Sequence, residues 1–291
     1  MLRCPSESPS VFFEGPGRCR TRVLFLFSAL LAGLAFAHPA ASHDLWLLPG
    51  KFVIAPGEKI RVFVNSGDDF PASDSLLGRR RIESLRLHAA SGESLLSEFV
   101  AAGESLTAEF LGPDPGTAIL ALSTRPRAVR LHAEEFNQYL EEDGLPRILE
   151  LRKKLGEMNR PVVERYTKWA KAILQVGDRQ DGTWSKALGL KLEIVPQTNP
   201  STLRPGQSLA VVVLFDGHAL AGVEVTGGYA GVASRRVKTV TDSDGWATLV
   251  MGESGRWYLR AIHMIRLPDS GDDPEAIWES FWSTLTFEVS P

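Results

Sequence analysis

From residue 43 onward, apolar and polar residues alternate with a period of two over many short segments. Residues 59–64, 84–87 and 106–110 alternate in this way, and residues 117–122 are more continuously apolar. A period of two places every second side chain on one face of a β-strand. Pro-Gly and Ser-Gly pairs separate the segments, as turns do. Residues 43–132 are therefore predicted to form an N-terminal β-sandwich.

The period of the apolar residues changes between residues 133 and 187. They recur there at helical spacing in three stripes, each bounded by proline or glycine. The stripes consist of Phe136, Tyr139 and Leu140; then Ile148, Leu149 and Leu155; then Val162, Tyr166, Trp169, Ile173 and Leu174. The pattern predicts a short three-helix insertion and linker over residues 133–187. Its charged residues, Glu164 and Lys168 among them, are expected on ordinary exposed helix faces.

Residues 188–291 return to the pattern of short strands. The predicted strands are residues 190–195, 209–215, 222–226, 237–241, 247–251, 257–262 and 284–289. About seven strands in about 100 residues is the count typical of an immunoglobulin-like sandwich. Asp242-Ser243-Asp244-Gly245 predicts a hairpin turn with Gly245 in the left-handed conformation. The fold class predicted for the whole chain is mainly β, with two sandwich domains joined by the helical insertion.

The residues ahead of position 43 predict export. Basic residues precede an apolar run over residues 23–36, and this length suits a secretory signal better than a membrane span of roughly 20 residues. Residues 35–37 form an A-x-A cleavage pattern, and residues 40–42 offer an alternative cut. Residues 1–42 are therefore expected to be a signal peptide and a frayed start. The expected location is the periplasm, and no second apolar run predicts a transmembrane segment after cleavage.

Composition narrows the classes of function. Both cysteines, Cys4 and Cys19, precede the apolar run, so no disulfide is expected in the mature chain. The net charge of −3 argues against a nucleic-acid partner. The sequence contains no G-x-S-x-G, no H-E-x-x-H and no glycine-rich phosphate loop, so we do not expect an enzyme.

Histidines supply the main candidates for a binding site. Either cleavage would leave His38 or His43 at the new N-terminus, where an α-amine beside an imidazole can chelate a late transition metal. His263 falls on the apolar face of a strand and could be a ligand or, equally, a core-edge histidine bonded to backbone. His132 is a further ligand candidate or a helix-capping, exposed residue. The hypothesis is a nickel or cobalt site, with copper as an alternative, formed by His43 and His263 with lesser roles for His132 and Glu193.

The rival hypothesis involves no metal. It describes an adhesive or scaffolding β-sandwich protein of the cell envelope that binds a glycan or another protein. Exposed tryptophans would supply its contacts, and the candidates are Trp169, Trp184, Trp246, Trp278 and Trp282. Spatial clustering decides between the hypotheses, because two histidines converging within about 5 Å would favour a metal.

Two resemblances to known families bear on these alternatives. Residues 216–225, 241–245 and 255–261 resemble the transthyretin-like, carboxypeptidase-regulatory type of sandwich, which implies a mostly structural or adhesive module. Almost the whole mature chain resembles a second family. The residues that carry this likeness are His43-Asp44-Leu45-Trp46-Leu47, residues 136–144, Arg165-Tyr166 with Ala170-Lys171, Leu188-Gly189-Leu190 with Glu193, Ile262-His263-Met264 and residues 282–287.

That second family is an exported bacterial family of unknown function, once grouped with the NikM component of nickel and cobalt uptake. The resemblance implies a periplasmic accessory protein linked to metal uptake. Its partner would be a membrane metal transporter or another envelope protein. NikM components are membrane proteins, whereas no span is expected here after cleavage, so the resemblance implies at most an accessory role in uptake.

Overall fold

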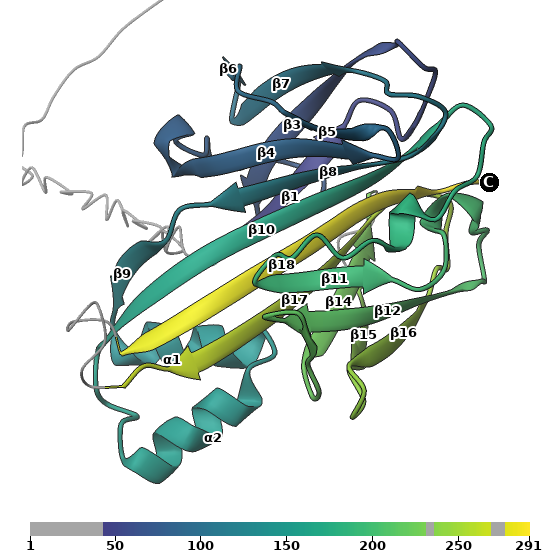
Figure 1. The fold of residues 1–291 in the computed structure, drawn as a ribbon. Helices are drawn as coiled ribbons and strands as arrows, with labels where there is room; N and C mark the ends of the chain where they lie inside the picture. The colour runs from purple at the N-terminus through teal and green to yellow at the C-terminus, as the bar shows by residue number, and fades with distance from the viewer. Residues whose placement is uncertain (1–42, 231–235, 269–276) are drawn as a thin grey trace, which may run out of the picture. The chain divides into compact units, whose positions relative to one another are not determined.

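A computed structural model of the chain describes residues 43–230, 236–268 and 277–291. Most described residues lie in strands that form three sheets, with two α-helices at one end of the central sheet (Figure 1). The chain is therefore mainly β, as the residue pattern predicts. The predicted signal peptide lies outside the described residues. Within the described residues, no helix is both long and apolar enough to cross a membrane.

The central sheet contains ten strands. Eight of them follow one path, in the order β15 (Val237–Val240), β14 (Glu224–Tyr229), β17 (Gly255–Arg266), β18 (Trp278–Val289), β10 (Val162–Val176), β8 (Gly116–Thr124), β4 (Ile82–Ala89) and β5 (Gly92–Leu95). Two more, β2 (Val53–Ile54) and β9 (Arg127–Leu131), pair with β10. Strands from both predicted sandwiches thus share one sheet. The boundaries between the two sandwich domains stay a prediction.

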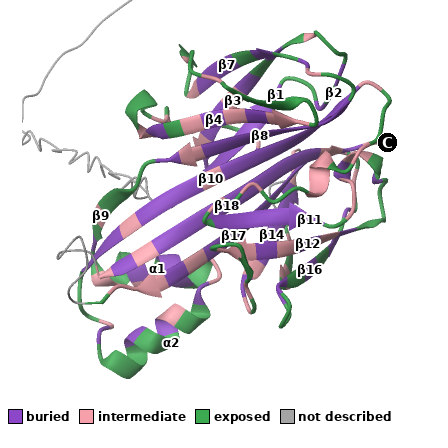
Figure 2. Cartoon of the chain, in the orientation of Figure 1, coloured by how far each residue is buried: buried purple, intermediate pink, exposed green. Residues whose placement is uncertain are grey.

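Two four-stranded sheets complete the β structure. The first has the order β1 (Asp44–Pro49), β3 (Lys59–Gly67), β7 (Ser105–Leu111) and β6 (Val100–Ala102). The second contains β11 (Leu192–Pro196), β12 (Ser208–Phe215), β13 (His218–Ala219) and β16 (Trp246–Val250), and we call it the outer sheet. In Figure 2 the middle strands β8, β10 and β18 of the central sheet are buried along most of their length. The central sheet thus provides the core against which the other elements pack.

Two helices confirm the first two predicted stripes. Helix α1 (Ala133–Glu142) buries Phe136, Tyr139 and Leu140, and helix α2 (Pro146–Leu155) ends at Gly156, whose φ of 69° suits a left-handed cap. Both helices contribute to an apolar cluster that includes Trp278 and Trp282. Short 3₁₀ turns occur at η1 (Arg79–Arg81), η2 (Thr183–Ser185) and η3 (Pro200–Thr202).

The third predicted helix is wrong. Residues 162–176 form β10, which lies in the middle of the central sheet between β18 and β8. Because both faces of this strand are covered, nearly every position is buried, and apolar residues lie on both faces instead of alternating with polar ones. A stretch that is apolar on both faces also satisfies a helical spacing, and periodicity alone does not separate the two. The strand is nonetheless rich in β-branched and aromatic residues, which favour strands.

Strand β1 lies across the central sheet and joins the first sheet to it. The hydroxyl of Thr286 donates to the carbonyl of Leu47 at 2.6 Å, and that of Thr284 donates to the carbonyl of Leu45. These bonds place Asp44 and Trp46 of β1 against the face of the central sheet that also packs on α1. The stretch that begins at His43 is thus part of the core.

Candidate binding surface

His43 lies immediately before β1 and is half-buried. Its Nδ1 is 3.3 Å from the hydroxyl oxygen of Ser75, and its Nε2 is 3.6 Å from a carboxylate oxygen of Asp68. Its backbone carbonyl accepts a hydrogen bond from the ammonium group of Lys168. The imidazole is therefore held by a loop of the first sheet.

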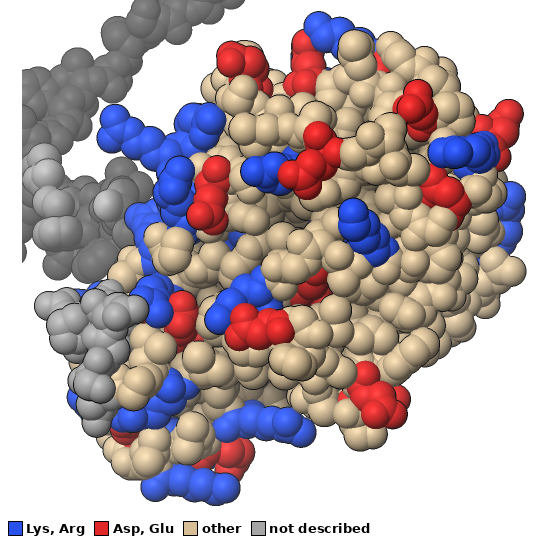
Figure 3. Space-filling model, in the orientation of Figure 1, with Lys and Arg blue, Asp and Glu red and all other residues tan. Residues whose placement is uncertain are grey.

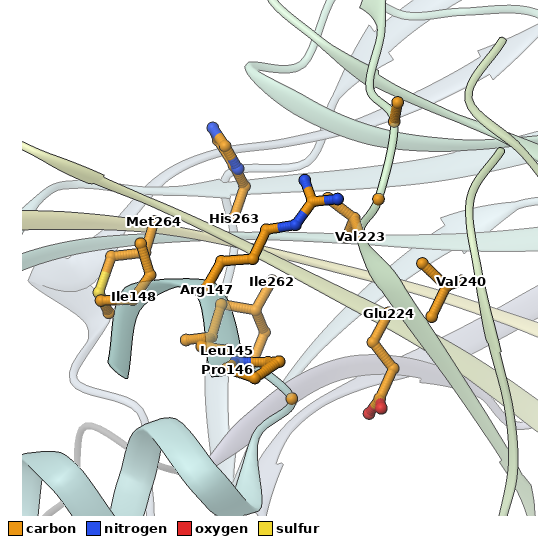
Figure 4. Close-up of a pocket in the computed structure, with 13 residues that line it drawn as sticks. Leu145, Pro146, Arg147, Ile148, Val223, Glu224, Val240, Ile262, His263 and Met264 are labelled. Atoms are coloured by element: carbon orange, nitrogen blue, oxygen red, sulfur yellow. The ribbon is translucent and has the colours of Figure 1, made fainter. Parts of the chain in front are cut away.

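His263 lies on the opposite face of the central sheet. Its ring packs edge-on against Phe215 of the outer sheet, with centroids 4.6 Å apart, and stacks on Phe281. Burial lowers the pKa of the imidazole, which favours its neutral form. His263 also lines a cavity of about 260 Å³ beside the start of α2, where Arg147 extends towards Val223 (Figure 4). It is a core-edge histidine whose neighbours are aromatic.

The two lesser ligand candidates already have other partners. His132 is exposed at the start of α1, and its backbone N–H donates to the Glu135 carboxylate at 3.0 Å. Glu193 is buried and forms an ion pair of 2.8 Å with Lys171. It also accepts hydrogen bonds from the backbone N–H groups of Leu188, Gly189 and Leu190. Its carboxylate therefore has a structural role.

The four candidate ligands do not come together. His43 contacts the face of the central sheet that carries β1, whereas His263 contacts the outer sheet on the other face. Among the described residues, no three His, Cys, Asp or Glu side chains form a group that could hold a metal ion. The nickel, cobalt or copper site stays a prediction without support from this arrangement.

Charged side chains gather instead between β1, β10 and β17, and we call Asp44, Glu164, Lys168 and Arg260 the buried charge layer. Arg260 donates to a carboxylate oxygen of Asp44 at 3.3 Å and to one of Asp143, at the margin of the layer, at 2.7 Å. Glu164 accepts hydrogen bonds from the hydroxyls of Ser280 and, at 3.2 Å, Tyr139. The ammonium group of Lys168 lies 4.4 Å from the centroid of the Trp282 ring.

Burial shifts the pKa values within this layer. Loss of solvation disfavours the charged form of a buried group. It therefore raises the pKa of Glu164 to about 7 and lowers the pKa of Lys168 to about 8. Burial also opposes the charge of Arg260, but Asp44 and Asp143 outweigh it and raise its pKa. The second oxygen of Glu164 has no hydrogen-bond partner among the described residues, which adds to the cost of a negative charge on this group.

The sequence pattern did not reveal this layer. Glu164 and Lys168 were expected on an exposed helix face, which is wrong, since both are buried on the strand β10. One signal could have found the layer: charged residues within a stretch rich in β-branched and aromatic residues imply a strand with buried ionic partners. The layer ties β1 and the end of α1 to the central sheet.

A second unusual region is apolar and uncovered. We call residues 237–250, which comprise β15, the turn after it and β16, the hairpin edge. Val240, Trp246 and Val250 are 58%, 44% and 52% exposed, and they are three of the ten large apolar side chains that are exposed among the described residues. On β16, Trp246, Thr248 and Val250 point outward while Ala247 and Leu249 are buried. Trp246 pairs with the half-buried Val212 of β12, which extends this apolar face.

The turn of the hairpin edge has Gly245 in the predicted left-handed conformation, but the flanking strands do not form the predicted hairpin, because β15 pairs with β14 and β16 pairs with β12 in another sheet. Gly245 has a φ of 75°, and the Asp242 carboxylate accepts from the backbone N–H groups of Asp244 and Trp246, both at 2.9 Å. These bonds fix the direction in which β16 begins. Of the five candidate tryptophans, only Trp246 is exposed; Trp169 and Trp184 are half-buried, and Trp278 and Trp282 are buried.

The backbone of β16 is open along one side. Among the described strands it pairs only with β12. At one end of this pairing the backbone N–H of Val213 donates to the carbonyl of Gly245, and at the other end the N–H of Met251 donates to the carbonyl of Gln207. Hydrogen-bonded pairs alternate along an antiparallel ladder, so Ala247 and Leu249 belong to such pairs with β12. Thr248 and Val250 therefore direct their N–H and C=O groups away from β12. No described strand pairs with this outer edge, although the chain at the end of β15 approaches its start: the N–H of Asp242 donates to the carbonyl of Trp246 at 2.9 Å.

Comparison with known proteins gives a family and no function. Residues 40–265 match the sequence profile of DUF4198, a domain of unknown function. A comparison with curated proteins finds no matching sequence.

Among solved structures, the D0-D1 domain of intimin is 14% identical, with 85% of this chain and 98% of that chain covered and a TM-score of 0.23. The Escherichia coli adhesin FdeC is 15% identical, with 87% and 65% covered and a TM-score of 0.24. The Yersinia pseudotuberculosis adhesin InvE is 14% identical, with 86% and 59% covered and a TM-score of 0.22. Likenesses with TM-scores this low say nothing about what this chain binds.

Proposed function

This chain belongs to the DUF4198 family, and we propose that it is a non-catalytic binding module of the cell envelope that holds a partner protein by strand addition. The observation that carries the proposal is the open, apolar outer edge of β16. A partner segment in extended conformation would pair with the free backbone groups of Thr248 and Val250. Main-chain hydrogen bonds of this kind supply affinity in many β-augmentation complexes.

The composition of β16 supports this proposal. Exposed edge strands are ordinarily protected by lysine, proline or a bulge, because an unprotected edge invites pairing with other chains. The β16 sequence Trp-Ala-Thr-Leu-Val contains neither a charge nor a proline, and its pairing with β12 is regular. By contrast, the edge strand β5 carries Glu93, which pairs with Arg86 at 2.6 Å. The edge strand β6 also lacks a charge and a proline but has only three residues, so β16 is the longer unprotected edge.

The outward side chains would supply specificity. Trp246 offers a large aromatic surface, Val250 is exposed on the same face of β16, and Val240 is exposed on β15. Aromatic residues of this kind often act as anchors of protein interfaces. An aromatic face could also stack on a glycan, but only a strand partner would use the free N–H and C=O groups of β16.

Site-specific photo-crosslinking in the native host tests the proposal. A photoreactive amino acid at Thr248 should form one discrete crosslink, and the same group at Leu95 on β5 should not. A Thr248→Pro substitution removes the outward N–H but leaves the pairing with β12 intact, whereas Thr248→Ala keeps the N–H.

With the photoreactive group moved to Val250, Thr248→Pro should abolish the crosslink and Thr248→Ala should retain it. Both variants should keep the melting temperature of the wild type. Equal crosslinking in the two variants, or none at position 248, would refute strand addition.

A further inference from the structure

A second cavity lies apart from the hairpin edge and is lined by cations. It has a volume of about 170 Å³ and is bounded by Ser75, Arg81, Thr124, Arg127, Tyr166 and Lys168, together with apolar residues of the loop before η1. Among the described residues, neither Asp nor Glu lines this cavity. It is larger than a water needs and smaller than the cavities of about 300 Å³ or more that hold whole drug-sized ligands. It therefore suits one small polar group of a ligand.

The three cations are positioned by the fold. The guanidinium carbon of Arg81 lies 5.0 Å from the centroid of the Tyr166 ring, and its Nη1 donates to the carbonyl of Arg125. The ammonium group of Lys168 lies 5.3 Å from the same centroid, on the inner side of the cavity. Arg127 pairs through its backbone with Tyr166 and is exposed. Arg81 and Lys168 thus lie near one tyrosine ring, and Arg127 lines the same cavity.

Charge balance leaves this cavity positive. Asp44 and Asp143 together carry one more charge than their partner Arg260, and this charge acts on Lys168, so Arg81 and Arg127 carry the positive charge of the cavity. Burial and repulsion from Arg127 lower the pKa of Arg81 and outweigh the opposite effect of Tyr166. A bound anion would relieve this repulsion.

Basic residues continue outside the cavity. Arg79 and Arg80 of η1 and Arg125 before β9 are exposed, and Lys and Arg side chains gather over this side of the molecule (Figure 3). Glu83 is the acidic residue next to η1 in the sequence. A ligand whose anionic group enters the cavity would therefore meet further positive charge at the entrance.

We propose that this cavity binds a phosphate group, either as free phosphate or as the phosphate of a larger ligand. More than one positive charge favours a dianion over a single carboxylate, and arginine forms paired hydrogen bonds with phosphate oxygens. The site is separate from the hairpin edge, so it adds a second ligand to the partner protein proposed above.

Titration calorimetry of the intact mature protein with inorganic phosphate, at low ionic strength and pH 6.5, tests the first source. A parallel flotation assay uses phosphatidylcholine vesicles with or without phosphatidic acid, which presents the phosphate on a lipid. Arg127→Gln removes a cavity cation that is exposed, and Arg80→Gln removes the same charge just outside the cavity. Both variants should keep the wild-type melting temperature.

Loss of one charge-assisted contact should weaken binding by at least about tenfold in Arg127→Gln, with less than about threefold change in Arg80→Gln. This difference in calorimetry identifies free phosphate as the ligand, and the same difference only with phosphatidic acid vesicles identifies a lipid-borne phosphate. Equal weakening in the two variants would mean that the whole basic surface attracts anions without a site. That outcome, or no binding to either probe, would overturn the proposal.

Discussion

The buried charge layer and the hairpin edge invert the usual relation between residue type and binding. The layer contains acids and bases of the kind from which active sites are built, yet these groups bind one another and their neighbours and hold β1, α1 and the central sheet together. The hairpin edge contains no titratable side chain on β16, yet its side chains and backbone remain available. Availability of groups, more than their chemistry, points to the binding surface.

The difference in burial also predicts how the two regions respond to mutation. Charges that are buried and paired are expensive to separate, because the remaining partner stays out of water without compensation. Side chains at an open edge contribute little to folding, since much of their surface stays in water in the folded state. Substitutions in the layer should therefore affect stability, and substitutions at the hairpin edge should affect binding.

The largest expected effect is that of Arg260→Met. It leaves Asp44 and Asp143 buried or nearly buried without their cation, which should reduce the free energy of unfolding by about 3 to 5 kcal/mol. Urea denaturation at pH 7 measures this loss. Arg256→Met on the same strand is the matched control. Among the described residues, the Arg256 side chain forms a hydrogen bond only with the backbone carbonyl of Gly50, at 3.1 Å. A loss below about 1 kcal/mol for Arg260→Met would show that the layer is not what fixes β1.

The next effect is a pH dependence of stability that Glu164 creates. Its pKa is raised to about 7 from 4.5, so the folded protein holds this proton while the unfolded chain releases it. The contribution of this group to the stability of the folded wild type should therefore be largest below about pH 4.5. As pH rises to 7 it should lose stability, by about 3 kcal/mol for this shift.

Glu164→Gln cannot ionise, so its stability relative to the wild type should rise by that amount between pH 4.5 and 7.5. Denaturation curves across this range, with Glu141→Gln on the exposed face of α1 as the control, measure the difference. A constant difference between wild type and Glu164→Gln would contradict a protonated buried carboxyl group.

A smaller effect is expected at the hairpin edge. Trp246→Ala should change the free energy of unfolding by about 1 kcal/mol, because 44% of the residue is already exposed. Trp257→Ala, which truncates a fully packed tryptophan of the same sandwich, should cost about 3 to 5 kcal/mol. Thermal and urea denaturation compare the two. A similar loss for both would mean that Trp246 is part of the core, and the comparison between the two regions would fail.

The sequence predicted the parts of the fold that depend on local pattern. Alternation gave most strands of residues 188–291, and the Asp242 to Gly245 turn followed from its residue types. Strand β10 was mistaken for a helix because it is apolar on both faces, which only its position in the middle of a sheet explains.

The sites were harder to predict than the strands. His43 and His263 were grouped by residue type, but the face of the sheet on which each one lies depends on long-range pairing, such as the contact of His263 with Phe215. The hairpin edge needed the same information: Trp246 could be named from the sequence, but its exposure could not. Whether β16 has a neighbour on its outer side is a property of the whole sheet.

Amide hydrogen exchange of the free protein is the most direct test of an open β16 edge. The amides of Ala247 and Leu249 bond β12 and should exchange slowly, whereas those of Thr248 and Val250 point outward and should exchange within about tenfold of the unprotected rate. The account predicts this alternation along β16, with protection of Thr248 and Val250 appearing only when the partner protein is added. Slow exchange of all four amides in the free protein would show that the edge is already covered, and it would contradict binding by strand addition.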